Sequence, residues 1–176
     1  MSEDTLGTEG EPYDLAEELG RARQIVYDRL AVQARSRADL EQALAKKHVP
    51  AEVAAAVLDK FEAAGLVDDE EFARAWVQGR QRSKGLSSRV LAMELRRKGV
   101  DDEIAREALA ELDPELEVQA AHRLVQAKLR SMGSLDETTK IRRLTGMLAR
   151  KGYSPQLAFE VVREELGAEV QPLDSL

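Results

Sequence analysis

Basic side chains recur at one position in three similar stretches of this 176-residue chain, where they could bind phosphate or carboxylate groups. The stretches read LEQALAKKHVPAEVAAAVL (40–58), LAMELRRKGVDDEIAREAL (91–109) and LTGMLARKGYSPQLAFEVV (144–162). In each stretch, leucines at the first and fifth positions precede two or three cations and a turn residue. Cations in the last turn of a helix also complement its negative end, at about 0.3–1 kcal/mol each. Helix capping and anion binding therefore both stay open for these residues.

A second basic segment, GRQRSKGLSSR (79–89), is predicted to connect two helices because it contains Gly79 and Gly85. A solvated surface loop is the alternative to a binding loop. The segment contains no aromatic residue, so contacts to a partner or to the DNA backbone are expected rather than base stacking. The candidate binding residues lie in this segment, in the second and third stretches and directly before the third stretch; they are Arg80, Arg82, Lys84, Arg89, Arg96, Arg97, Lys98, Arg142, Arg143, Arg150 and Lys151.

Catalytic and metal-binding chemistry is not indicated. Cysteine is absent, which excludes disulfides and thiolate sites. His48 and His122 are far from other ligand-type residues at metal-site spacing. No phosphate-binding glycine loop occurs. Phe72 and Trp76, four residues apart, are expected on one buried helix face. We therefore expect a binding protein that is not an enzyme and that has no cofactor.

Charge is divided into blocks along the chain, although the net charge is −7. Residues 1–20 contain seven acidic side chains and no basic one, and residues 80–98 contain seven cations and only one carboxylate. Charges act within about 10 Å at ordinary salt, so the local blocks determine which partner binds. No apolar run of 18 residues occurs and the N-terminus is acidic, so we expect a soluble, cytoplasmic protein without a membrane partner.

The three stretches predict a repeated pair of helices. Leucines at i and i+4 form one apolar stripe. Ser36 and Ser87 are predicted N-caps of the first helix. Gly99 and Gly152 are predicted turn residues, and His48 occupies the same position in the first copy.

A longer helix is predicted before each pair, so the chain should be all-α with about nine helices. Short helix pairs bury their apolar faces by stacking, which favours an elongated right-handed or curved solenoid of three tandem three-helix repeats. The predicted longer helices are 14–33, 68–82 and 114–131. The predicted domains are a disordered acidic tail (1–12), repeat 1 (13–66), repeat 2 (67–112), repeat 3 (113–167) and a C-terminal tail (168–176).

Three motifs carry a resemblance to a known family over roughly residues 20–166. They are GLVDDEEFARAWVQGRQRSKG (65–85), the following SSRVLAMELRRKGV and the later LARKGYSPQLAFEVV. In this combination the chain resembles the RecX family of bacterial RecA regulators, and it departs from the pattern at His48, where glycine is common. The resemblance implies an all-helical protein that binds the RecA recombinase and its filament on single-stranded DNA. We also expect a monomer that binds single-stranded, and in addition double-stranded, DNA weakly. It also implies lodging in the filament groove and inhibition of filament extension, ATP hydrolysis, strand exchange and coprotease activity.

Two other functions are compatible with the residues. One is a stand-alone DNA-binding module of stacked helix-turn-helix units. Its second helices would then read bases, yet AEVAAAVLDK, DDEIAREALAE and SPQLAFEVVRE are acidic or neutral. The other is a scaffold repeat unrelated to DNA.

Overall fold

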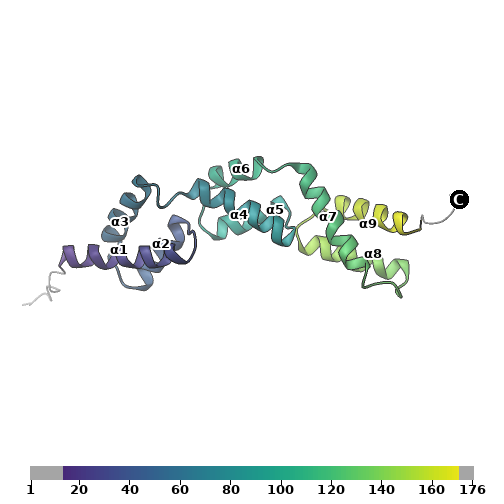
Figure 1. Ribbon diagram of the computed structural model, residues 1–176, viewed down its shortest axis with the longest axis horizontal. Coiled ribbons are helices and arrows are strands. Elements are labelled where there is room, and N and C mark those ends of the chain that lie inside the picture. Colours follow the sequence, from purple (N-terminus) through teal and green to yellow (C-terminus); the bar gives the residue numbers. More distant parts are fainter. Residues whose placement is uncertain (1–13, 171–176) are drawn as a thin grey trace, which may run out of the picture. The chain divides into compact units, whose positions relative to one another are not determined.

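The computed structural model describes residues 14–170, and all of the regular structure in that range is helical. The predicted acidic tail (1–12) and residues 171–176 of the predicted C-terminal tail lie outside the described residues. Figure 1 shows the helices in chain order. They are α1 (Leu15–Val32), α2 (Arg37–Lys46), α3 (Ala51–Ala63), α4 (Asp69–Lys84), α5 (Ser88–Arg97), α6 (Asp102–Ala110), α7 (Pro114–Leu129), α8 (Glu137–Arg150) and α9 (Pro155–Val170). Over this range the prediction of an all-α protein with nine helices is confirmed.

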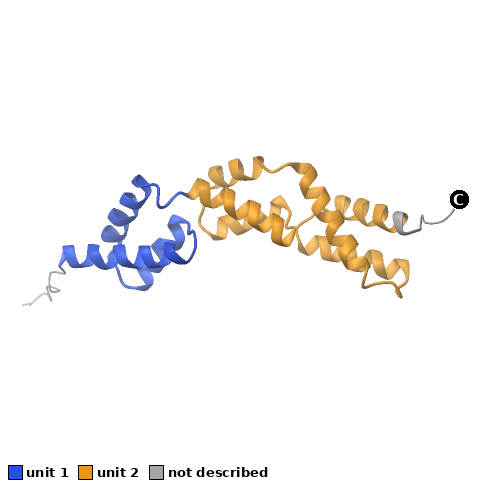
Figure 2. Ribbon diagram, in the orientation of Figure 1, with its two compact units in different colours: residues 1–68 blue, residues 69–176 orange. Residues whose placement is uncertain are grey.

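The helices pack in threes, and each trio has its own hydrophobic core. Within α1–α3, α4–α6 and α7–α9, every helix contacts the other two. The three cores are separate clusters of buried aliphatic side chains. The chain divides into two compact units, Met1–Asp68 and Asp69–Leu176, which Figure 2 shows in blue and orange. The second unit therefore contains two of the three repeats, and the solenoid arrangement of all three stays a prediction.

The paired leucines of the repeat lie at the centre of each core. Each pair is at most 1% exposed, as the stripe at i and i+4 predicts. The pairs are Leu40 and Leu44, Leu91 and Leu95, and Leu144 and Leu148. Full burial of one such side chain contributes about 1.5–3 kcal/mol to stability.

The turn after the first helix of each pair has one geometry in all three repeats. The turn residues His48, Gly99 and Gly152 have φ values of 59°, 69° and 92°, in the left-handed region. In each turn the next residue donates a backbone hydrogen bond of 3.1 Å to the second leucine of the pair, as Val100 does to Leu95. This pattern is the Schellman C-cap. His48 is thus a turn residue, as predicted.

Side-chain caps begin most of the helices. Ser36 and Ser87 are almost fully buried and accept from the backbone N–H of Asp39 and Val90, as predicted. The third copy differs, because α8 begins four residues earlier than the repeat alignment implies, after Asp136. Backbone and side-chain hydrogen bonds from Thr139 to this carboxylate lower the pKa of Asp136.

The basic segment 79–89 is not the predicted connector. Helix α4 continues to Lys84 and α5 begins at Ser88, so only residues 85–87 connect them. Gly79 lies inside α4, where glycine costs about 1 kcal/mol relative to alanine. Gly85, with a φ of 58° and a hydrogen bond from its N–H to the Gln81 carbonyl, ends the helix instead. Arg80, Arg82 and Lys84 therefore project from a helix.

Candidate partner-binding surfaces

Two of the predicted binding residues, Arg80 and Lys98, surround the indole of Trp76. The guanidinium carbon of Arg80 lies 4.4 Å from the ring centroid and the Lys98 ammonium lies 5.2 Å from it. The indole Nε1 donates to Glu94 at 2.9 Å, and Arg80 pairs with the same carboxylate at 3.2 Å. The Trp76 ring also stacks on Phe72, with 5.7 Å between the centroids. Arg80 and Lys98 thus hold α4 and α5 together, a role that the sequence did not reveal.

Three other predicted residues on α5 are exposed without a shared cavity. Arg96 forms an ion pair with Asp102 at 3.3 Å, and both side chains are more than 70% exposed. Such a pair contributes at most about 1 kcal/mol. Arg89 and Arg97 are exposed as well. These positions remain available to a partner, but nothing in the fold gathers them.

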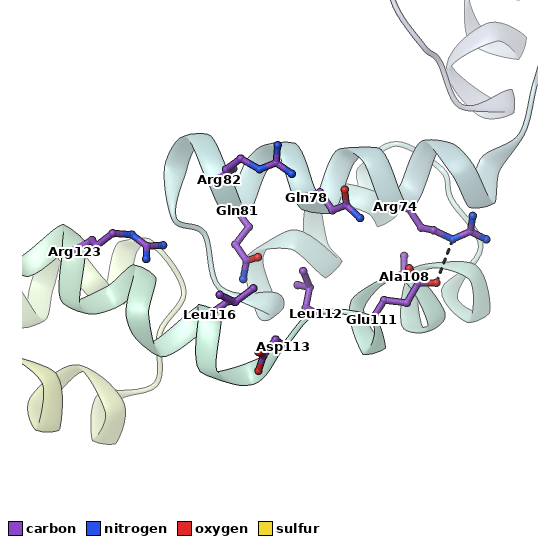
Figure 3. Close-up of a pocket in the computed structure, with 10 residues that line it drawn as sticks. All are labelled: Arg74, Gln78, Gln81, Arg82, Ala108, Glu111, Leu112, Asp113, Leu116 and Arg123. Carbon is purple, nitrogen blue, oxygen red and sulfur yellow. Dashed lines mark hydrogen bonds and ion pairs between the residues drawn. The ribbon is translucent and has the colours of Figure 1, made fainter.

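Arg82 instead lines a cavity of about 530 Å³ between α4, α6 and α7. Arg123 on α7 lines the same cavity, and neither guanidinium forms an ion pair with a residue that the structure describes. Between them, Gln81 points from α4 toward Leu112 and Leu116 (Figure 3). Its amide Nε2 is buried and has no hydrogen-bond partner. Two exposed guanidinium groups thus line the cavity without an ion-pair partner among the described residues, beside one buried amide donor that lacks the acceptor such donors ordinarily have.

A second cavity of about 510 Å³ continues from the first, because Gln81, Arg82 and Arg123 line both. It adds the cations Lys84 and Lys151. The two cavities together are called the α4–α7 groove below. Repeat 2 thus contributes the predicted binding residues Arg82 and Lys84 and the neighbouring Gln81 to the groove. Repeat 3 contributes Arg123 and Lys151.

The joint between the α4–α5 turn and the α8–α9 turn fixes one end of the α4–α7 groove. The backbone N–H of Ser87 donates to the Lys151 carbonyl at 3.0 Å. The hydroxyl of Tyr153 donates to the Gly85 carbonyl, and the Lys151 ammonium donates to the Lys84 carbonyl, both at 2.8 Å. Burial raises the pKa of Tyr153 to about 12. Lys151 therefore contributes to the joint as well as to the groove.

The joint leaves no room for a side chain at Gly152. A Cβ at this position would overlap the side chains of Val90 and Ser87. On the other side of the connection, the hydroxyl of Ser88 donates to Glu117 of α7. Close backbone approach of this kind requires glycine independently of its positive φ.

A separate basic pocket lies on repeat 3 and is called the repeat-3 basic pocket below. It has a volume of about 380 Å³ and contains Lys128, Arg143 and Arg150, with Met132 and Met147 beside them. No carboxylate lines it, and none of the three cations forms an ion pair with a residue in the described part of the chain. Three unpaired cations around one hollow favour an anionic ligand.

Sequence reasoning found some residues of these surfaces and missed others. It placed Arg82, Lys84, Arg143, Arg150 and Lys151 among the candidates, and these residues line the groove or the pocket. Arg142 is exposed on α8 but lines neither. Arg123, Lys128 and Gln81 were missed. The feature of the sequence that could have pointed to Arg123 and Lys128 is that both lie on α7, a helix that begins with acidic residues.

Other chemistry is limited among the described residues. His122 of α7 lies 2.6 Å from Glu165 and 3.5 Å from Glu164 of α9, which links the two helices. Within residues 14–170, no cluster of three or more metal-ligand side chains could hold an ion. In the same range, no helix combines the length and the apolar character needed to cross a membrane.

Comparison with known proteins covers all three repeats. Models of the first, second and third three-helix domains of RecX match residues 22–61, 68–109 and 115–162. A regulatory protein RecX of Amycolatopsis mediterranei is 50% identical over 157 residues, covering 88% of this chain and 90% of that protein. The RecX protein of Mycolicibacterium smegmatis is 47% identical over 153 residues, covering 85% and 81%. The crystal structure of RecX from Lactobacillus salivarius has the same fold, with a TM-score of 0.75, 21% identity and coverage of 85% and 97%.

Proposed function

The chain belongs to the RecX family of regulatory proteins, and on that basis we propose that it binds the RecA recombinase and its filament on single-stranded DNA. In this role it lodges in the filament groove and opposes extension, and thereby inhibits ATP hydrolysis, strand exchange and coprotease activity. The observation that carries the proposal is the match of all three repeats, at 50% identity to a regulatory protein. Membership of a family of regulators also points to action by binding rather than by catalysis.

The physical mechanism is a shift in assembly equilibrium. A ligand that binds a blocked filament more tightly than a growing one favours the blocked state by its difference in affinity. At a concentration 100 times its Kd, such a ligand stabilises the state it binds by about 2.7 kcal/mol. No cofactor is needed, and a cytoplasmic monomer without a membrane partner is the form we propose.

Contacts to DNA are proposed as an auxiliary part of this function. The repeat-3 basic pocket supports them, because it presents Lys128, Arg143 and Arg150 without a lining carboxylate. Phosphate contacts of this type are independent of sequence and weaken with salt. They would keep the protein near the single strand on which RecA assembles.

The test is RecA-catalysed strand exchange with this protein added below the RecA concentration. We expect strand exchange and RecA ATP hydrolysis to fall together, because both depend on the filament. The control is the same titration of a RecA-independent ATPase. Unchanged strand exchange over a concentration range in which the protein is folded would contradict the proposal.

A stand-alone DNA-binding module is the second candidate, favoured only by the repeat-3 basic pocket. The second helices of the repeats do not support base readout, since α6 begins with Asp102 and Glu103 and carries one cation, Arg106, already paired with Glu103. Binding to single strands without RecA separates the two functions. Tight binding with a steep salt dependence and no effect on RecA would favour the module.

A further inference from the structure

The α4–α7 groove has a chemical character different from that of the repeat-3 basic pocket. Its middle carries the guanidinium groups of Arg82 and Arg123, which form no ion pair with a residue in the described part of the chain. Guanidinium N–H groups bind carboxylate oxygens at charge-assisted hydrogen-bond distance, and arginine can do so through two donors. The middle of the groove is therefore suited to an acidic group.

Apolar side chains adjoin these donors. Leu112 and Leu116 line the same cavity as Arg82 and Arg123. Leu116 is 45% exposed, a large fraction for a leucine, and Figure 3 shows it beside the Gln81 amide. An apolar side chain of a ligand would cover this leucine and remove its surface from water. The groove thus offers a site for an apolar side chain next to a site for an acidic group.

The acidic residues of the groove disfavour a nucleic acid. Glu111 and Asp113 line the cavity at its α6 end, where Glu111 pairs with Arg74 at 3.2 Å. A phosphate chain following the groove would pass these carboxylates, and like charges at short range repel. The residues that line the two cavities also include no aromatic side chain on which a base could stack.

We propose that the α4–α7 groove binds a protein segment in which an acidic side chain lies next to an apolar one. Resting on the function proposed above, we assign this segment to RecA. The acidic group binds between Arg82 and Arg123, and the apolar group packs on Leu116. The groove is preorganised for this ligand, because the hydrogen bond of 2.8 Å from Tyr153 to the Gly85 carbonyl fixes one end of it. Preorganisation reduces the conformational entropy that is lost on binding.

Charge reversal of Arg82 and Arg123 tests whether the groove binds an acidic group. The variant R82E/R123E is compared with R143E/R150E, which reverses two cations of the repeat-3 basic pocket in the same compact unit. Two titrations are run on each full-length protein: binding to RecA without DNA, and binding to a single-stranded oligonucleotide without RecA. We expect R82E/R123E to lose RecA affinity by at least about tenfold, since two charge-assisted contacts are reversed, and to keep its affinity for the oligonucleotide. R143E/R150E should show the opposite pattern.

Each other outcome overturns the inference. If R82E/R123E loses oligonucleotide affinity and keeps RecA affinity, the groove binds nucleic acid. If it keeps both, the groove is not the RecA site, while inhibition of strand exchange by the unmodified protein would still support the proposed function. If the unmodified protein does not bind RecA, the proposed function and this inference fail together. Circular dichroism checks the fold, and R82Q/R123Q replaces the reversal variant if that one unfolds.

Site-specific photo-crosslinking tests whether an apolar group of RecA packs on Leu116. A benzophenone side chain is introduced in place of Leu116 or, as a control, of Met93 on α5, and both native side chains are 45% exposed. After irradiation with purified RecA, we expect a crosslink from position 116, to a RecA peptide with an Asp or Glu within a few residues, and none from position 93. Equal crosslinking from both positions, or a RecA peptide without an acidic residue, would overturn the inference.

Discussion

Tyr153 shows how a single hydroxyl in the turn of repeat 3 supports the joint with repeat 2. Its side chain is 3% exposed, and its hydroxyl donates to the Gly85 carbonyl at 2.8 Å. The corresponding residues of the other copies, Val49 and Val100, have no hydroxyl. The bond is therefore specific to the joint between repeats 2 and 3.

The Tyr153→Phe variant should lower the free energy of unfolding by about 1–3 kcal/mol at neutral pH, because a buried carbonyl loses its donor. The pH dependence has a definite sign. Burial raises the pKa of Tyr153 from 10.0 to about 12 in the folded state, so the stabilisation is fully present below pH 10 and is lost as the pH rises toward 12. Urea unfolding at pH 8 and at pH 11 measures both effects.

The matched control is Tyr27→Phe, because Tyr27 is 52% exposed. It should leave stability nearly unchanged at both pH values. Tyr153→Phe should also lose less stability between pH 8 and pH 11 than the unmodified protein does. If the unmodified protein and Tyr153→Phe lose the same amount, Tyr153 is not the titrating group.

The surroundings of some candidate residues could not be recognised from the sequence, because they come from distant parts of the chain. Arg80 pairs with Glu94 of the next helix, and Arg123 lines the α4–α7 groove only because α7 borders the same cavity as α4. Cation counting treated Arg80 and Arg82 alike, although Arg80 contacts Trp76 and Arg82 lines a cavity. The sequence of a segment shows how many charges it carries, but it does not show which distant residues pair with them.

The helical elements were far more predictable than the binding surfaces. The period of four between paired leucines and the glycine after the cations are local signals, and they predicted the cores and the turns of the repeat. The start of α8 was missed because Asp136 caps it in place of the serine of the other copies. The predicted helix 68–82 ends two residues before α4 does, but the assignment of residues 79–84 to a connector on the basis of Gly79 was wrong. The contact between Trp76 and Arg80, one turn apart, stabilises the helix there.

The first repeat offers a test of the turn geometry, because His48 has a φ of 59° where the other copies have glycine. A residue other than glycine in this conformation costs about 1–2 kcal/mol, and glycine adds back about 0.5–1 kcal/mol of chain entropy in the unfolded state. His48→Gly should therefore raise the free energy of unfolding of the Met1–Asp68 unit by up to about 1 kcal/mol.

Hydrogen exchange of the core amides of α2 and α3, measured on the full chain, reports this change. The neighbouring Lys47→Gly is the control, since Lys47 has a φ of −96° and gains nothing from glycine. It should lower stability. A loss of stability in His48→Gly would mean that the imidazole makes contacts that outweigh the backbone strain.

At the scale of the whole molecule, the protein separates two kinds of surface within the Asp69–Leu176 unit. The α4–α7 groove combines cations, leucines and two carboxylates, whereas the repeat-3 basic pocket is cationic without a lining carboxylate. A filament of RecA on single-stranded DNA presents both protein and phosphate. A regulator with both surfaces could distinguish the filament from free DNA, because only the filament engages the two together.

Hydrogen–deuterium exchange of the full chain, with and without the RecA filament on single-stranded DNA, tests whether the α4–α7 groove binds RecA while the repeat-3 basic pocket binds DNA. We expect slower exchange in residues 78–85 of α4 and its C-terminal turn and in the part of α7 that carries Arg123, with DNA alone protecting only the segments around Arg143 and Arg150. Unchanged exchange throughout residues 14–170 on adding a saturating filament would contradict this assignment, as would the same protection pattern with DNA alone.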